Sequence, residues 1–217
     1  MPNAGQQQLI DRLAGELEPV RRRSDRTDAL TVALLCGLEL ALFLGAGMAR
    51  PDLRAAAELP SFWWKLGSCG LFALAAAAAA IRSFDPAETP RRYLRWLPVI
   101  VALSAGAGAL IDGAARDQAS SLIARLGSPG GVRCVATIVG LSLPSVAAFG
   151  LLMRRGAATE PGGTALAAGV AAAAWAAFVF AFACPHDDPL YVAVWYGAGC
   201  GPVVLLARLL LPTLTRW

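Results

Sequence analysis

The chain has 217 residues, of which 57% are hydrophobic and only 16% are charged. A soluble domain of this length needs more polar groups for its surface, so the composition predicts an integral membrane protein. The net charge of +4 is not gathered in a basic run with interleaved aromatic residues, and we therefore expect no direct binding to nucleic acid. No catalytic triad, phosphate loop or dinucleotide fingerprint occurs in the sequence, which predicts no enzyme activity.

The first predicted element is a short amphipathic helix at about residues 7–18, ahead of Pro19. A helix this short is marginal in isolation and gains order by laying its apolar stripe into a partner groove or onto the bilayer. Its mixed acidic and basic character disfavours simple adsorption to anionic lipid. We therefore expect residues 1–28 to form a partner-binding segment. Its apolar residues, which recur at helical spacing, are Leu9, Ile10, Leu13, Leu17 and Val20.

Six apolar runs follow, each of roughly the 17–25 residues that a bilayer demands. Because backbone groups in lipid must bond within their own segment, these runs predict helices rather than strands. The expected fold is all-α, with one compact bundle of six transmembrane helices over residues 29–217. The runs cover about 29–48, 62–81, 94–111, 134–153, 164–183 and 191–211.

Basic residues are distributed unequally between the two sides of this bundle. With a cytoplasmic N-terminus, the inside segments carry 13 of the 19 basic residues and the outside segments carry six, which favours both termini in the cytoplasm. The inside residues are Arg12, Arg21, Arg22, Arg23, Arg26, Arg82, Arg91, Arg92, Arg95, Arg154, Arg155, Arg208 and Arg216. The outside residues are Arg50, Arg54, Lys65, Arg116, Arg125 and Arg133.

Cys134 and Cys184 are the candidate functional residues. Cys134 begins the fourth span and Cys184 follows the fifth, so this topology places both at the outer boundary, facing an oxidising compartment. The short connection around residues 154–163 predicts that these two spans are neighbours. Thiols at a polar boundary can be oxidised, bind a soft metal or form a structural disulfide. The three cysteines inside spans are expected to be packing residues: Cys36, Cys69 and Cys200.

His186 is the only histidine and lies two residues after Cys184, in a polar turn with two carboxylates. Thiolate, imidazole and carboxylate groups suit zinc-like and other thiophilic ions. Cys134, Cys184 and His186 are therefore the candidate ligands of a transient heavy-metal ion, and no resident cofactor is expected. The alternative is that His186 is a solvated turn residue, because the flanking prolines favour a tight polar connection.

Glu39 is the only carboxylate deep in a predicted span. A buried carboxylate is costly in lipid, and we expect a structural position facing the bundle. Two other functions stay open at this point. A small transporter needs several polar groups along its path, whereas a membrane thiol oxidoreductase typically carries a C-x-x-C pair, and the sequence contains neither feature.

Several segments resemble the six-span negative regulators of sigma factor F, the NrsF type of membrane anti-sigma factor. The resemblance covers nearly the whole chain and is most specific in the Cys-Pro-x-x-x-Pro turn that leads into Val-Trp-Tyr-Gly. The segments are Leu9-Ile10-Asp11-Arg12-Leu13 with Leu17 and Pro19-Val20, Phe62-Trp63-Trp64-Lys65, Arg133-Cys134, Leu152-Met153-Arg154-Arg155-Gly156-Ala157, and residues 184–197, from Cys184-Pro185-His186-Asp187-Asp188-Pro189 to Val194-Trp195-Tyr196-Gly197.

This resemblance implies a signalling protein of a bacterial inner membrane. Members of the family hold an extracytoplasmic-function sigma factor at the cytoplasmic face, and a cysteine pair matching Cys134 and Cys184 takes part in sensing oxidants or heavy metals. The expected partners are therefore that sigma factor, at residues 1–28, and the lipid bilayer. The oligomeric state does not follow from the sequence.

Overall fold

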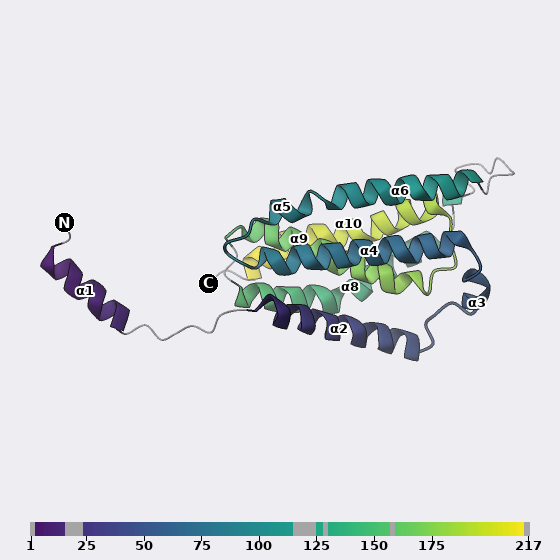
Figure 1. The fold of residues 1–217 in the computed structure, drawn as a ribbon. Helices are drawn as coiled ribbons and strands as arrows, with labels where there is room; N and C mark the ends of the chain where they lie inside the picture. Colours follow the sequence, from purple (N-terminus) through teal and green to yellow (C-terminus); the bar gives the residue numbers. More distant parts are fainter. Residues whose placement is uncertain (1–2, 16–23, 115–124, 128–129, 157–158, 215–217) are drawn as a thin grey trace.

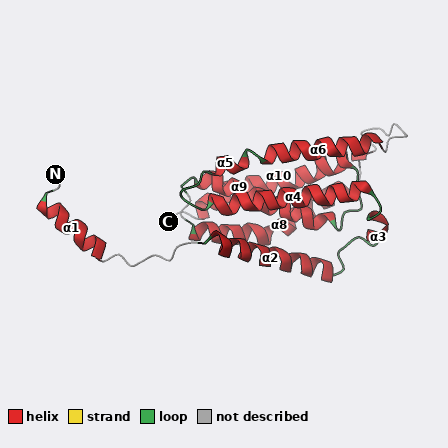
Figure 2. Cartoon of the chain, in the orientation of Figure 1, coloured by secondary structure: helices red, strands yellow, loops and turns green. Residues whose placement is uncertain are grey.

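The computed structural model describes residues 3–15, 24–114, 125–127, 130–156 and 159–214. All regular secondary structure in these ranges is helical (Figure 2). Figure 1 shows a bundle of long helices, with one short helix set apart at the N-terminus. The helices are α1 (Ala4–Gly15), α2 (Asp25–Gly45), α3 (Leu53–Ala56), α4 (Pro60–Ser83), α5 (Pro90–Leu94), α6 (Leu97–Ala114), α8 (Gly130–Arg155), α9 (Pro161–Ala181) and α10 (Pro189–Leu214).

Six helical stretches are long and apolar enough to cross a membrane, which confirms the predicted all-α, six-span fold. Helices α2, α4, α8, α9 and α10 begin two to four residues before the predicted apolar runs because their first turns are partly polar, whereas α6 begins three residues later than predicted. In α2, Asp25 and Asp28 precede the apolar run and lie in the first turn, where carboxylates interact favourably with the helix dipole. Proline occupies the first turn of α4 and of α9, a position that needs no backbone donor.

Helix α9 lies at the centre of the bundle and packs against α4, α8 and α10. Nearly its whole surface is buried, and most of the buried residues are alanine. Small side chains allow close approach of helices in a membrane, where packing rather than the hydrophobic effect drives association. At Gly169 the approach is so close that an added Cβ would meet Ala207 and the backbone of Val204 in α10. The expected contact between the fourth and fifth spans, α8 and α9, is confirmed.

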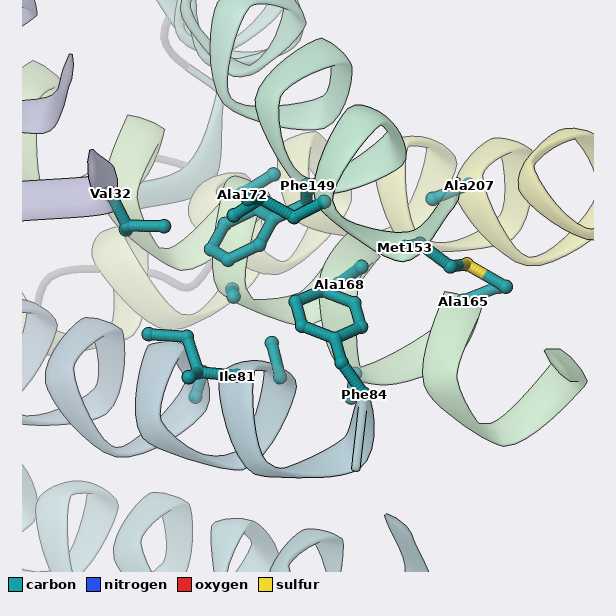
Figure 3. Close-up of a cluster of buried hydrophobic side chains, with 14 of the residues drawn as sticks. Val32, Ile81, Phe84, Phe149, Met153, Ala165, Ala168, Ala172 and Ala207 are labelled. Carbon is teal, nitrogen blue, oxygen red and sulfur yellow. The ribbon is translucent and has the colours of Figure 1, made fainter. Parts of the chain in front are cut away.

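One hydrophobic cluster joins α2, α4, α8, α9 and α10 (Figure 3). Phe84 packs against Phe149 with ring centroids 6.5 Å apart. Helix α2 contributes little to this cluster, because only Val32 and Phe43 of its side chains are buried. Two grooves flank α2. One, of about 400 Å³, lies between α2 and α8, and the other, of about 600 Å³, lies between α2 and α4. Helix α2 is therefore an edge helix of the bundle.

Candidate functional site

The structure brings Cys134 and Cys184 together. Cys134 lies in the first turns of α8, and Cys184 lies in the loop between α9 and α10. Both are free thiols, and they belong to one buried cluster in which Cys134 is close enough to lower the pKa of Cys184. The Cys134 sulfur lies 3.3 Å from the Tyr191 hydroxyl, and the Cys184 sulfur lies 3.8 Å from the His186 carbonyl oxygen. The two residues predicted to share one membrane face are thus direct neighbours.

Both thiols are buried, whereas the sequence predicted that they lie at a polar boundary. Cys184 is 0% exposed and Cys134 is 3% exposed. They belong to an aromatic-rich cluster that includes Phe180, Tyr191 and Tyr196. A reagent can therefore reach this pair only through the polar turn or during a transient opening of the cluster.

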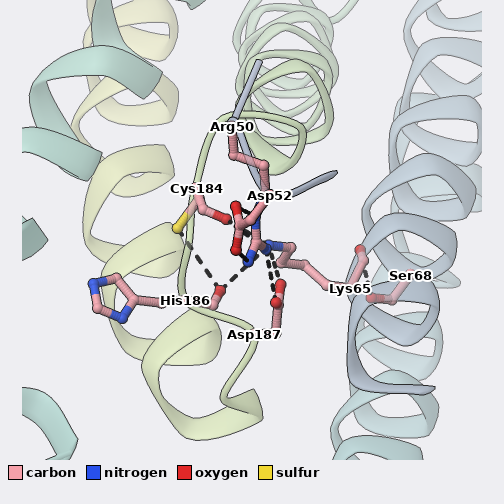
Figure 4. Close-up of polar contacts among 7 residues, drawn as sticks. All are labelled: Arg50, Asp52, Lys65, Ser68, Cys184, His186 and Asp187. Carbon is pink, nitrogen blue, oxygen red and sulfur yellow. Dashed lines mark hydrogen bonds and ion pairs between the residues drawn. The ribbon is translucent and has the colours of Figure 1, made fainter. Parts of the chain in front are cut away.

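Asp187 is held by two buried cations rather than placed beside the thiols. Its carboxylate oxygens lie 2.5 Å from Lys65 Nζ and 2.7 Å from Arg50 Nη1 (Figure 4). Lys65 Nζ and Arg50 Nη1 also donate to the Cys184 carbonyl oxygen, at 3.0 and 3.3 Å. We call Arg50, Lys65 and Asp187 the charge clamp. It fastens the Cys184 loop to the start of α4 and to the segment that follows α2.

Arg50 is further fixed by the backbone and by a second carboxylate. Its amide donates to the Phe182 carbonyl oxygen at 3.0 Å, and its guanidinium makes two 2.8 Å hydrogen bonds to Asp52. Hydrogen bonds from Arg50 lower the pKa of Asp52 to about 2. Because charge-assisted hydrogen bonds of this kind are strong and directional, the segment after α2 keeps a defined position against the Cys184 loop.

Asp188 holds the other side of the Cys184 loop in place. Its oxygens lie 2.5 and 2.6 Å from Arg125, which also bonds Asp112 at 2.9 Å. Asp188 additionally accepts from the amides of Leu190 and Tyr191 at the start of α10, as an N-cap residue does. Burial raises the pKa of Asp188, but the hydrogen bonds from Arg125 and these amides outweigh burial and hold it below its ordinary value. Both carboxylates of the turn thus serve the loop's structure.

His186 does not join the thiols in a ligand set. Its ring stacks against the Tyr191 ring with centroids 4.2 Å apart, and Figure 4 shows the ring directed away from the charge clamp. Among the described residues, no three His, Cys, Asp or Glu side chains gather closely enough to hold a metal ion. The predicted set of Cys134, Cys184 and His186 is therefore not assembled in this arrangement, whereas the two cysteines alone are.

The surroundings of Cys184 favour its ionised form. The neighbouring Cys134 side chain lowers the pKa of Cys184 against the opposing effect of burial, and the positive charge of Lys65 lowers it further. Since the thiolate is the nucleophile, the lowered pKa favours Cys184 as the attacking sulfur of the pair.

We expect the alkylation rate of Cys184 to rise through a midpoint below the ordinary thiol value of about 8.5 and to level off above it, because the pKa of Cys184 is lowered and the thiolate is the reactive form. Mass mapping of Cys184 labelling by a small neutral thiol reagent over a pH series measures this midpoint. Cys134→Ala removes the neighbour that lowers the pKa of Cys184 and should move the midpoint up toward the ordinary value of about 8.5. An unchanged midpoint in Cys134→Ala contradicts the effect assigned to Cys134.

Three of the five predicted partner-binding residues lie on α1, apart from the bundle (Figure 1). Leu9, Ile10 and Leu13 are each more than half exposed. Leu17 and Val20 lie outside the described residues. The described part of the stripe therefore presents three large apolar side chains that are available to a partner.

Glu39 of α2 faces the bundle, as expected. Its Oε2 atom accepts from Trp175 Nε1 of α9 at 3.0 Å and from Ser145 Oγ of α8 at 3.4 Å. These contacts are the polar link between the edge helix and the bundle interior at this depth. Of the other cysteines, Cys69 and Cys200 pack against the thiol cluster and Cys36 packs against the larger hydrophobic cluster.

The charge clamp is the part of the site that sequence reasoning missed. The sequence distribution of charges identifies Arg50 and Lys65 only as outside residues that orient the bundle. For Lys65 a signal is present, because it is the only charged residue in the apolar run 62–81, where an unpaired cation is costly and a partner is expected.

Fold and site together define a multi-pass helical membrane protein with a buried dithiol at one end and a separate amphipathic helix at the other. A family model described as NrsF, Negative regulator of sigma F, matches residues 13–217. The chain belongs to this family, which is regulatory rather than catalytic.

Two curated relatives carry the family name. The chain is 31% identical over 214 residues to "Anti-sigma-F factor NrsF" of Caulobacter vibrioides (strain NA1000 / CB15N), covering 96% of this chain and 98% of that protein. It is 28% identical over 182 residues to "Probable anti-sigma-F factor NrsF" of Azospira oryzae (strain ATCC BAA-33 / DSM 13638 / PS), covering 81% and 82%. No solved structure matches the chain.

Proposed function

We propose that this protein is a membrane-bound anti-sigma factor that holds an extracytoplasmic-function sigma factor at the cytoplasmic face of a bacterial inner membrane. Oxidation of Cys134 and Cys184, or capture of a heavy-metal ion by their sulfurs, releases the sigma factor. The observation that carries the proposal is the pair of neighbouring buried thiols, of which Cys184 lies in a loop that is tied to the segment following α2. The names of the relatives support the sigma-factor partner.

The orientation in this proposal rests on charge. With both termini in the cytoplasm, 13 of the 19 basic residues lie inside, as the positive-inside rule favours. Residues 1–28 are then the cytoplasmic sigma-binding segment, and residues 29–217 are the sensor domain. The exposed stripe of Leu9, Ile10 and Leu13 supports binding in a groove of the sigma factor.

The thiol step is a two-electron oxidation. With a peroxide as oxidant, the Cys184 thiolate attacks one peroxide oxygen, the O–O bond breaks, and a sulfenic acid forms. The Cys134 sulfur then displaces the hydroxyl group as water, so that one disulfide and two waters result from two thiols and one hydrogen peroxide. A thiophilic cation such as cadmium instead displaces both thiol protons and bridges the sulfurs.

Helix α2 supplies the connection between the two faces. Arg50 holds the Cys184 carbonyl at the outer end, and the chain from the other end of α2 leads directly to the partner-binding segment. Because α2 is an edge helix with two buried side chains, it can shift without disrupting the core around α9. To move the partner from mostly bound to mostly free, this coupling must amount to about 5 kcal/mol.

The test replaces the thiols. Cells in which Cys134→Ser/Cys184→Ser replaces the wild type should lose induction of a sigma-dependent reporter by hydrogen peroxide and by cadmium. Cys36→Ser is the matched control, because Cys36 lies in α2 and outside the thiol cluster, and it should keep both responses. Retained induction by both stressors in the double variant overturns the proposed sensor. Loss of one response alone identifies the physiological signal.

A further inference from the structure

The groove between α2 and α4 has a volume of about 600 Å³ and apolar walls. Val32 and Ala33 of α2, Ala73 and Ala77 of α4, and Phe149 of α8 line it. These residues lie within three membrane-spanning helices. Apolar cavities exclude water, and the solvent beside a spanning helix is lipid, so an acyl chain is the molecule that fits these walls.

Three charged side chains stand at one end of this groove. Asp25 and Arg26 belong to the first turn of α2, and Arg82 belongs to the last turn of α4. All three are exposed. Within the part of the chain that the structure describes, no ion pair joins any of them to a protein partner. The Arg82 guanidinium lies over the Tyr93 ring, 5.2 Å from its centroid, which leaves its edge free for an oxyanion.

The charges at the groove end are mixed, and this selects among phospholipid headgroups. Two guanidinium groups suit a phosphate, which accepts charge-assisted hydrogen bonds from both. A carboxylate beside them suits a primary ammonium, which donates hydrogen bonds. A quaternary choline has no such donor, and an anionic glycerol headgroup leaves the carboxylate facing a phosphate with no cation between them.

We propose that the groove between α2 and α4 is a binding site for one aminophospholipid of the phosphatidylethanolamine type. An acyl chain fills the apolar groove, the phosphate lies between Arg26 and Arg82, and the ammonium group faces Asp25. Basic pockets between spanning helices are an established class of headgroup site. This site differs from such pockets in including an acid, and it is independent of the thiol chemistry.

The full-length protein in nanodiscs made from equal parts of phosphatidylethanolamine, phosphatidylglycerol and phosphatidylcholine provides the test. After release into mild detergent, native mass spectrometry should find one retained phosphatidylethanolamine. Arg26→Gln/Arg82→Gln should lower its retention about a hundredfold, the equivalent of losing two charge-assisted contacts worth about tenfold each. The matched control Arg154→Gln/Arg155→Gln removes two arginines at the end of α8 that do not line the groove and should retain the lipid.

Asp25→Asn separates the headgroup assignment from the fold, since Asp25 is an exposed residue in the first turn of α2. This variant should keep one bound phospholipid and shift its preference from phosphatidylethanolamine toward phosphatidylglycerol. Equal retention in the arginine double variant, retention without headgroup preference, or an unchanged preference in Asp25→Asn each overturns the proposed site.

Discussion

Asp187→Asn is expected to lower the free energy of unfolding by about 3–5 kcal/mol, the cost of removing one partner of a buried ion pair. The Lys65 side chain is 0% exposed and Asp187 is 9% exposed, and Arg50 shares the same carboxylate. Asparagine keeps the shape of aspartate but removes its charge, so two buried cations lose their common counterion. Denaturant titration of the protein in detergent micelles or bicelles measures the loss.

Asp52→Asn is the matched control, since Asp52 also bonds Arg50 at 2.8 Å. Its side chain is 54% exposed, and water replaces a lost contact at an exposed site. We expect a much smaller loss of stability than with Asp187→Asn. Equal effects of the two substitutions show that the charge clamp does not stabilise the loop through burial.

Leu9→Ala/Ile10→Ala/Leu13→Ala is expected to release the proposed sigma factor without any stress. Burying one such side chain contributes about 1.5–3 kcal/mol, so three lost side chains remove on the order of 5 kcal/mol of binding free energy, or several thousand-fold in affinity. A sigma-dependent reporter in unstressed cells and co-purification from solubilised membranes measure the release. Deletion of residues 7–20 should have the same outcome.

Gln8→Ala/Asp11→Ala changes the opposite face of α1 and is the matched control for the apolar stripe. This variant should repress the reporter as the wild type does. Both sets are compared at equal amounts of protein in the membrane. Continued repression by the triple variant contradicts the assignment of α1 as the binding element.

The spans could be predicted from the sequence because each apolar run has the length of a bilayer crossing. The hydrophobicity of the runs also indicates which helix lies at the centre of the bundle. The fifth run, residues 164–183, contains no charged residue and is hydrophobic on all faces, as a helix surrounded by others is. Its short connection to the fourth run correctly indicated neighbouring helices.

The ion pairs could not be predicted, because they join residues that the fold alone brings together. Lys65 and Asp187 come from α4 and from the loop before α10, and Arg50 follows α2. Hydropathy places all three near one membrane face but does not say which charges meet. The burial of Cys184 has the same origin, because Phe180, Tyr191 and Tyr196 enclose it only when α9 and α10 pack.

The charge clamp also determines when, during synthesis of the chain, the Cys184 loop can reach its folded position. Arg50 and Asp187 are 137 residues apart in the chain, so their contact forms only after α9 and the following loop have been synthesised and inserted. Residues 1–28, by contrast, leave the ribosome before the six spans do. Under the proposed function, a growing chain can capture its sigma factor before its thiol sensor is complete. Each newly made molecule therefore begins as a repressor and becomes responsive to stress only when its last two helices are in place.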